Sequence, residues 1–351
     1  MNRTVRFILA LVAALSVLGL GCSEVDAKLG HEIRGLIEVL EVGEPIYYEN
    51  LTIIPVYSTR VRDHGHYSTL DEALDCGWLE ISEVDGGSVP RVKVTNRSGN
   101  RIFIMGGEIL TGCRQDRIVG RGVILSPWAR NVIIPVYCVE QGRWTYESET
   151  FYSKRNLGTC RLRAEGQKAS DGAQQDIWDH VSTITEQVGL SSGSSRFQEA
   201  YESDAARRRI SRVEKHMERI PHLCPDAIGA VIGVGGRISS VDIFINPDLF
   251  GRIWPKLVRS SALAALCDPA RGSITQRDAI RCLRGLHDRQ YERRCAIGQG
   301  FELYAIDGDM NVNALVYWND VFHLAAFPED ADDRDSKHES NSERRIPVRR
   351  R

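Results

Sequence analysis

The sequence lacks several patterns that would assign a function directly. Its 351 residues contain neither an H-E-x-x-H zinc motif nor a G-x-x-x-x-G-K-[ST] phosphate loop. The nine cysteines include no C-x-x-C pair, so neither a zinc knuckle nor a thioredoxin-like redox pair is indicated. The formal net charge is -2, and this lack of basic excess predicts no nucleic-acid partner. The sequence therefore predicts no metal site and names no cofactor.

The N-terminal apolar run is too short to cross a bilayer. Arg3 and Arg6 precede this run at residues 7–20, whereas a spanning helix needs about 20 apolar residues. The run closes on Gly19-Leu20-Gly21-Cys22, which resembles a bacterial lipoprotein signal. We predict a signal peptide at residues 1–21, acylation of Cys22, and a protein held on a membrane of the cell envelope. Cleavage after Ala27, giving a secreted or periplasmic protein, is one alternative, and an uncleaved buried helix is another.

The cysteine count fits two redox states. Acylation of Cys22 would leave eight cysteines, an even number that is compatible with disulfides in an oxidising compartment. A chain with 42% hydrophobic residues can also build a core that needs no disulfides, so free buried thiols are the alternative.

The N-terminal half is rich in strand signals. Residues 36–57 read as two strands around Gly43-Glu44-Pro45. Thr69 is the expected N-cap of a helix at residues 70–76, with Glu72 as its capping-box partner. Residues 78–140 then alternate short β-rich segments with turns, and residues 118–125 read as one such segment. This succession predicts an antiparallel sheet or sandwich.

The C-terminal half mixes helices and hairpins. Apolar residues recur at helical spacing after residue 170, and a second helix carries Arg207, Arg208, Arg209 and Arg212 on a basic side expected to be solvated. Gly235-Gly236 joins two β-branched runs as a hairpin. Asn246 is expected to cap a further helix, another helix starts near Thr275, and the last strands are expected at residues 301–306, 312–318 and 321–327.

These patterns predict an α+β protein with an antiparallel β-rich N-terminal half and a helical and β-hairpin C-terminal half. We expect residues 22–35 to be a linker and residues 36–327 to form a single domain with one core. Residues 328–351 are almost wholly polar, which is typical of a disordered charged tail.

Charged residues interrupt strand-like sequence at two places. Glu108 is followed by Gln115 and Arg117, and Glu140 is followed by Arg143 and Trp144. Lone buried charges are costly and must find partners, so we expect Glu108, Arg117 and Glu140 to come together around one site. Glu108 or Glu140 is a candidate catalytic base. The candidate ligand-binding residues are Gln115, Arg117, Arg143 and Trp144, since guanidiniums bind phosphate or carboxylate and an indole offers a stacking surface. Mutual pairing of these charges in a purely structural network is the alternative.

Several segments resemble one known family. They are Ile53-Ile54-Pro55-Val56-Tyr57, Leu70-Asp71-Glu72-Ala73-Leu74, Gly107-Glu108-Ile109-Leu110-Thr111-Gly112 with Gln115-Asp116-Arg117, and Cys138-Val139-Glu140-Gln141-Gly142-Arg143-Trp144. Together they resemble the ARG and Rhodanese-Phosphatase-superfamily-associated protein domain, over about residues 36–327. The family name refers to association with ADP-ribosylglycohydrolases and with rhodanese or phosphatase proteins. The resemblance therefore implies a link to ADP-ribose-like compounds and assigns no activity to the domain itself.

Three functions follow as hypotheses. In the first, the protein is a binding module that holds an anionic or nucleotide-like small molecule. In the second, it is a hydrolase of an ADP-ribose-like or nucleotide-like compound, with a Glu as general base. In the third, it is a structural lipoprotein of the envelope. An enzyme needs a carboxylate exposed in the same cleft as the arginines, whereas a scaffold keeps its carboxylates paired.

Overall fold

A computed structural model describes residues 29–60, 65–84, 90–143, 145–168, 172–190 and 196–329. Cys22, Trp144 and nearly all of the predicted tail lie outside these residues. The eight cysteines within the described ranges are free thiols. Over the same ranges, no helix is both long enough and apolar enough to cross a membrane.

The largest sheet joins the two ends of the chain. Its nine strands are β1 (Leu40–Val42), β2 (Ile46–Tyr48), β3 (Leu51–Ser58), β13 (Ala227–Val234), β14 (Arg237–Phe244), β15 (Tyr291–Cys295), β16 (Phe301–Ala305), β17 (Met310–Tyr317) and β18 (Asp320–Pro328). They follow the order β1-β3-β13-β14-β18-β17-β16-β15, with β2 also paired to β3, and every pairing is antiparallel. The prediction of two strands at residues 36–57 was wrong, because that segment holds three strands and the end of a helix.

Two smaller sheets come from the middle of the chain. The six-stranded sheet has the order β12-β8-β9-β11-β6-β5, and the three-stranded sheet has the order β10-β7-β4. Their strands are β4 (Tyr67–Thr69), β5 (Leu79–Glu83), β6 (Arg91–Asn96), β7 (Arg101–Ile104), β8 (Ile109–Gly112), β9 (Arg117–Val119), β10 (Val123–Leu125), β11 (Val132–Cys138) and β12 (Phe151–Tyr152). The expected single segment at residues 118–125 is divided between β9 and β10, which belong to different sheets. Pairing is antiparallel except between β4 and β7, which run parallel.

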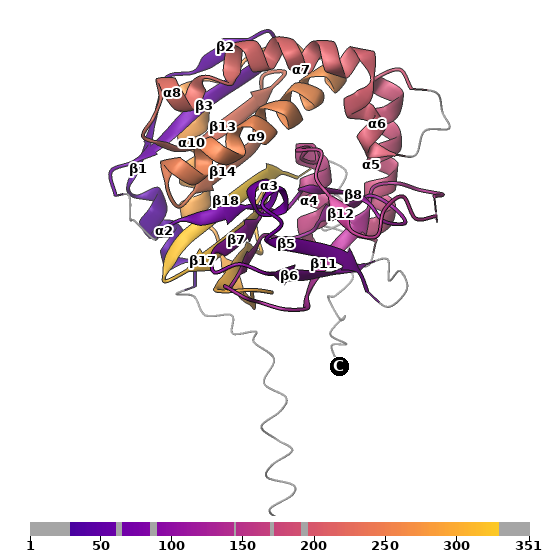
Figure 1. Ribbon diagram of the computed structural model, residues 1–351. Helices are drawn as coiled ribbons and strands as arrows, with labels where there is room; N and C mark the ends of the chain where they lie inside the picture. The colour runs from indigo at the N-terminus through magenta and orange to yellow at the C-terminus, as the bar shows by residue number, and fades with distance from the viewer. Residues whose placement is uncertain are drawn as a thin grey trace, which may run out of the picture.

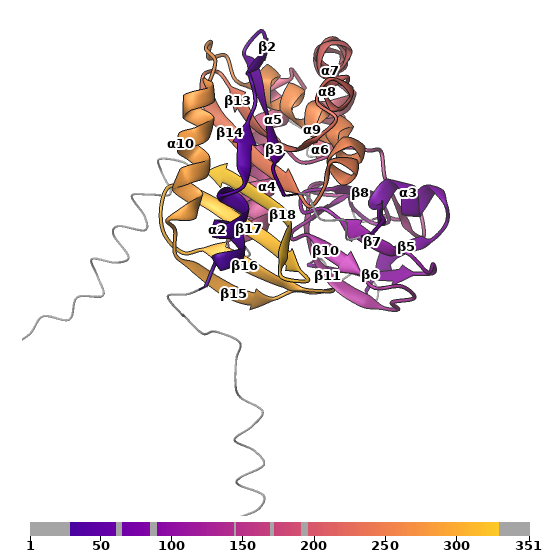
Figure 2. The ribbon, with the colours of Figure 1, turned by 90° about the vertical axis from the view of Figure 1, so that its left-hand side faces the viewer.

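Helices cover both faces of the nine-stranded sheet. The helices are α2 (His31–Ile37), α3 (Leu70–Asp75), α4 (Cys160–Lys168), α5 (Ala173–Gln187), α6 (Phe197–Glu202), α7 (Asp204–Met217), α8 (Ile220–Leu223), α9 (Pro247–Cys267) and α10 (Gln276–His287). In Figure 2, α2 and α10 lie on one side of this sheet and α7 and α9 on the other. Both faces are thus buried, which explains why all eight residues of β13 are buried. Helix α2 occupies residues that the sequence assigned to a linker.

The mixed α+β architecture predicted from the sequence is confirmed. Figure 1 shows the strand-rich middle of the chain, drawn in purple, beside the helices of the C-terminal half. Apolar side chains from α5, α7, α9 and β13 form one large core cluster, a second cluster lies under α2 and α10, and a third fills the smaller sheets. The N-terminal strand β3 contributes to the first two clusters, so residues at both ends of the domain share a core.

Local signals in the sequence placed several element boundaries correctly. Thr69 and Thr275 each form a capping box, with Glu72 and Asp278 respectively. The Asn246 side chain accepts a hydrogen bond from the backbone N–H of Leu249 at the start of α9. Gly235 and Gly236 have φ of 59° and 81°, which suits the two-residue turn between β13 and β14.

Candidate functional site

Glu140 and Arg143 form a bidentate pair at one edge of the six-stranded sheet. Arg143 Nε and Nη2 each donate to the Glu140 carboxylate at 2.7 Å, and the Asp116 backbone N–H donates to it at 3.0 Å. Arg143 Nη1 also donates to the Cys113 carbonyl at 2.8 Å. The Glu140 residue is only 5% exposed, so its charge is balanced almost entirely by protein groups. The neighbouring Trp144 lies outside the described residues.

Asp116 and Arg196 extend this ion network. Arg196 Nε donates to Asp116 Oδ2 at 2.8 Å, and Arg196 also contacts Glu147 at 3.1 Å. Burial raises the pKa of Asp116, although Arg196 opposes this shift. Neither residue was predicted from the sequence. Asp116 stands between the candidates Gln115 and Arg117, and alternation along a strand would have placed its side chain on the opposite face from theirs.

Arg117 and Gln115 belong to an adjoining buried group. Arg117 is fully buried, its Nη1 donates to the backbone and side-chain oxygens of Gln115 at 3.2 and 3.3 Å, and its Nη2 lies 3.8 Å from Glu83. Gln115 Oε1 also lies 3.2 Å from Cys138 Sγ. Burial raises the pKa of the Cys138 thiol to about 11, so it is a neutral group.

Glu108 lies in a separate network, against helix α9. The Lys256 ammonium bridges Glu108 and Asp71, with 2.8 Å to Asp71, and the Met105 backbone N–H donates to Glu108 at 2.9 Å. Burial raises the pKa of Glu108, which is fully buried. We expected Glu108 to lie around one site with Arg117 and Glu140. That expectation was wrong, because Glu108 pairs with Lys256. Glu108 precedes β8 and turns toward α9 and α3, whereas Glu140 turns toward the loop that holds Arg143.

A further buried ion network was not anticipated from the sequence. Arg163 on α4 donates two hydrogen bonds to Asp242 on β14, one of them at 3.0 Å, and His323 Nε2 on β18 lies 3.2 Å from Asp242. Burial alone would raise the pKa of Asp242, but Arg163 and His323 outweigh it and the pKa lies well below its usual range. Burial lowers the pKa of His323, which fits a neutral imidazole that donates to the carboxylate. The only sequence signal was an acidic residue inside the β-branched run at residues 237–245.

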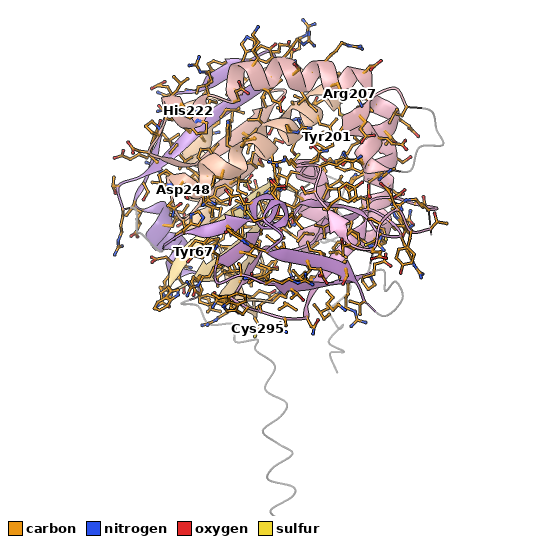
Figure 3. All side chains as sticks on the ribbon, in the orientation of Figure 1. Tyr67, Tyr201, Arg207, His222, Asp248 and Cys295 are labelled. Carbon is orange, nitrogen blue, oxygen red and sulfur yellow. The ribbon has the colours of Figure 1, made fainter. Side chains whose placement is uncertain are left out.

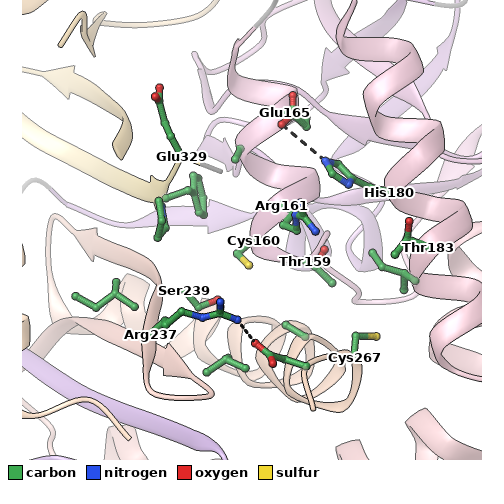
Figure 4. A pocket seen from close by; sticks show the side chains of 18 of the residues that line it. Thr159, Cys160, Arg161, Glu165, His180, Thr183, Arg237, Ser239, Cys267 and Glu329 are labelled. Carbon is green, nitrogen blue, oxygen red and sulfur yellow. Dashed lines mark hydrogen bonds and ion pairs between the residues drawn. The ribbon is translucent and has the colours of Figure 1, made fainter. Parts of the chain in front are cut away.

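A pocket lined by described residues lies beside this network. Its volume is about 580 Å³, and it opens between α4, α5, the β13–β14 hairpin and the C-terminal end of α9. Figure 4 shows Arg161, Glu165 and His180 around one part of it and Arg237, Ser239 and Cys267 around another. Arg161 and Arg237 are both exposed residues. None of the candidate residues that the structure describes lines this pocket.

Charged side chains in the pocket form pairs of opposite charge. Lys168 Nζ lies 2.9 Å from Glu165, His180 Nε2 lies 3.8 Å from the same carboxylate oxygen, and Arg237 Nη2 lies 2.9 Å from Asp268. Burial alone would raise the pKa of Glu165, but His180 and Lys168 outweigh it and the pKa is lowered. Glu165 is therefore an ionised carboxylate next to an imidazole. No group of three or more metal-ligating side chains occurs in the described parts of the chain.

Comparison with protein families assigns most of the chain. Residues 39–327 match the model of the ARG and Rhodanese-Phosphatase-superfamily-associated Protein domain. The chain belongs to this family. The matched range covers all three sheets, the ion networks and nearly all of the pocket lining, so these features lie inside the family domain. No curated protein and no solved structure showed a significant match to the chain.

Proposed function

We propose that this member of the family is an exported, lipid-anchored binding module for a small anionic, nucleotide-like ligand, and that the 580 Å³ pocket is its ligand site. The observation that carries the proposal is the pocket itself, with exposed arginines contributed by two different elements. Pockets for small molecules typically have volumes of about 300 to 1,000 Å³, and they combine apolar surface with a few polar groups.

The pocket residues suit a phosphate-bearing ligand. The guanidiniums of Arg161 and Arg237 come from α4 and from the start of β14, and a guanidinium binds phosphate oxygens bidentately. Ile238 and Phe327 supply apolar lining for a ring. Arg237 pairs with Asp268, whose side chain is 23% exposed. By contrast, Arg143 is bound to Glu140, which is only 5% exposed, so a ligand at Arg143 would have to displace a more deeply buried carboxylate. This comparison favours the pocket over the cluster chosen from the sequence.

A hydrolase is the second candidate, and Glu165 beside His180 is the observation that favours it. An ionised carboxylate in a ligand-sized pocket can accept a proton from water or orient an imidazole that does so. Glu108 and Glu140 are paired within the protein and do not line the pocket. This pairing is typical of a structural network, whereas an enzyme needs a carboxylate that is exposed in the cleft. Their role in binding or catalysis stays a prediction.

Removing both pocket arginines is expected to weaken ligand binding strongly. For Arg161→Ala/Arg237→Ala we expect affinity for ADP-ribose or nucleoside diphosphates to fall at least about tenfold, since a hydrogen bond to a charged group contributes about 1.5 to 3 kcal/mol. Isothermal titration calorimetry measures this change, and product analysis of the same samples detects hydrolysis.

The matched control is Arg207→Ala/Arg208→Ala, which removes two exposed arginines from α7, where Figure 3 labels Arg207. Equal ligand affinity in both double variants would contradict the pocket as the site. Turnover that Glu165→Gln abolishes while binding remains would favour the hydrolase over the binding module. Absence of binding by any nucleotide would favour the structural lipoprotein.

Anchoring is tested separately at Cys22. We expect Cys22→Ser to release the protein from membranes while leaving the globular part folded, because the acyl chains supply the firm attachment. Membrane fractionation measures the release, and circular dichroism checks the fold. An unmodified Cys22 in mass spectrometry of the native protein, or unchanged fractionation of the variant, would contradict the anchor and favour cleavage after Ala27.

A further inference from the structure

We propose that the protein docks on an anionic phospholipid bilayer through a face built around Trp128 and Trp318. This inference rests on the proposed anchoring at Cys22 and adds to it a defined orientation of the body. The face lies at the end of the molecule where the described chain begins. It comprises the β10–β11 loop, the β17–β18 turn and the start of α2.

Two exposed tryptophans mark the face. Trp128 is 61% exposed and Trp318 is 70% exposed, whereas tryptophans in folded proteins are highly buried on average. Both also have positive φ, 59° and 54°, which is an unfavourable backbone conformation for a bulky aromatic residue. Neither ring is needed to fill the core. Indole rings are enriched where apolar chains meet lipid headgroups, which gives these exposed positions a physical use.

A chain of contacts connects the two tryptophans. Trp128 lies against Gly99 in the turn before β7. Two residues farther on, the Arg101 guanidinium lies 5.9 Å from the centre of the Tyr317 ring, and this ring packs edge-on against Trp318 with centres 5.9 Å apart. In both Figures 1 and 2, β11 and β17 lie in the lower half of the molecule and β2 and α8 in the upper half. The contacts through Gly99, Arg101 and Tyr317 therefore place the two indoles on neighbouring parts of the surface.

The short segment between Cys22 and Leu29 would bring this end of the protein to the membrane. Asn319 and Asp320, next to Trp318, share the lining of one small pocket with His31 and Glu32 at the start of α2. Leu29 is only two residues before His31, and it follows Cys22 by seven positions. Seven residues span at most about 25 Å when fully extended. An acylated Cys22 would thus hold Leu29, and with it the start of α2 beside Asn319 and Asp320, near the lipid headgroups.

The charge on the face matches an anionic surface. Arg60, which lines the same pocket as Asn319, and Arg130, two residues from Trp128, are exposed, and Arg101 is half-buried between the tryptophans. The acidic residues beside them are Glu32, whose side chain is only 6% exposed, and the partly buried Asp320. Basic side chains near a membrane surface are attracted to anionic headgroups.

Quenching of tryptophan fluorescence by brominated lipids tests the face. The full chain, as processed by the cell, is incorporated into phosphatidylglycerol vesicles with or without bromine on the acyl chains. We expect clear quenching of the wild type and a several-fold smaller quenched fraction in Trp128→Phe/Trp318→Phe. The matched control is Trp178→Phe, which changes a partly exposed tryptophan on α5. Its quenched fraction should be no smaller than that of the wild type.

Equal quenching in the double variant and the wild type would overturn the docking face. Equal quenching in phosphatidylcholine vesicles would overturn the requirement for anionic lipid. Membrane fractionation tests the anchor at Cys22 independently. Firm fractionation without quenching overturns only the docking face, whereas loss of fractionation with retained quenching on added vesicles overturns only acylation at Cys22.

Discussion

Replacing Asp242 by Asn is expected to destabilise the protein by about 3 to 5 kcal/mol, because the change leaves a buried guanidinium without its counter-charge. Asp242 is fully buried, and Arg163, which donates two hydrogen bonds to it, has a side chain only 2% exposed. His323 would also lose its partner. Urea unfolding followed by circular dichroism measures the change in the free energy of unfolding.

The control is Asp248→Asn, which makes the same chemical change in an exposed ion pair with Arg252. Exposed pairs contribute about 0 to 1 kcal/mol, so this variant should resemble the wild type. Adding Arg163→Met to Asp242→Asn should recover part of the lost stability, since no unpaired charge then remains. A loss below about 1 kcal/mol in Asp242→Asn would contradict the tight pairing seen here.

The effect of Asp242→Asn should also shrink in acid. The pKa of Asp242 is lowered from its ordinary value of 3.8, so its stabilising contribution is complete above that pH and is lost as the pH falls toward the folded-state pKa. Asn does not ionise. The two free energies of unfolding should therefore converge at strongly acidic pH.

Replacing Glu140 by Ala is expected to cost about 3 kcal/mol if the surrounding network is structural, since Arg143 and the Asp116 backbone N–H both lose their acceptor. The value lies at the low end of the range for buried pairs because the Arg143 side chain is 20% exposed and can gain water. A thermal melt of the variant beside wild type, each with and without ADP-ribose, makes the measurement.

Glu149→Ala is the control for this second change, because Glu149 is an exposed glutamate in the same loop region. A melting temperature close to wild type in Glu140→Ala, together with loss of a ligand-induced shift, would favour a ligand site at Glu140 over a structural network. A large drop in melting temperature with no ligand effect in the wild type would end the enzyme hypothesis for this residue.

Local sequence signals were reliable where a feature depends only on close neighbours. The capping boxes at Thr69 and Thr275 need a partner three residues away, and the glycine pair at 235–236 sets the turn between adjacent strands. Family membership also rests on the order of residues along the chain and was predictable from motifs within residues 39–327. The α+β class followed from the sum of these local patterns.

Pairing between distant residues was much less predictable. The sequence showed that Glu108 and Arg117 needed partners. The pattern of charged residues in the strands could not identify which residues those partners are. Lys256 reaches Glu108 from 148 residues away, and Asp242 meets Arg163 across 79 residues. An isolated Lys inside an amphipathic helix pattern reads as solvent-exposed, so nothing in the sequence placed Lys256 in the core. The pocket was missed for the same reason, since it draws on six separated segments.

The sequence by itself determined the α+β class, the family, and the helix starts and hairpin turn that depend on close neighbours, because each depends on contiguous residues. The export signal stays a prediction. Only the tertiary structure decided that β3 pairs with β13, which charges neutralise one another, and where a ligand-sized pocket opens. Those features depend on which distant surfaces pack together. Packing is set by the whole core, where burial of apolar area outweighs any single local preference.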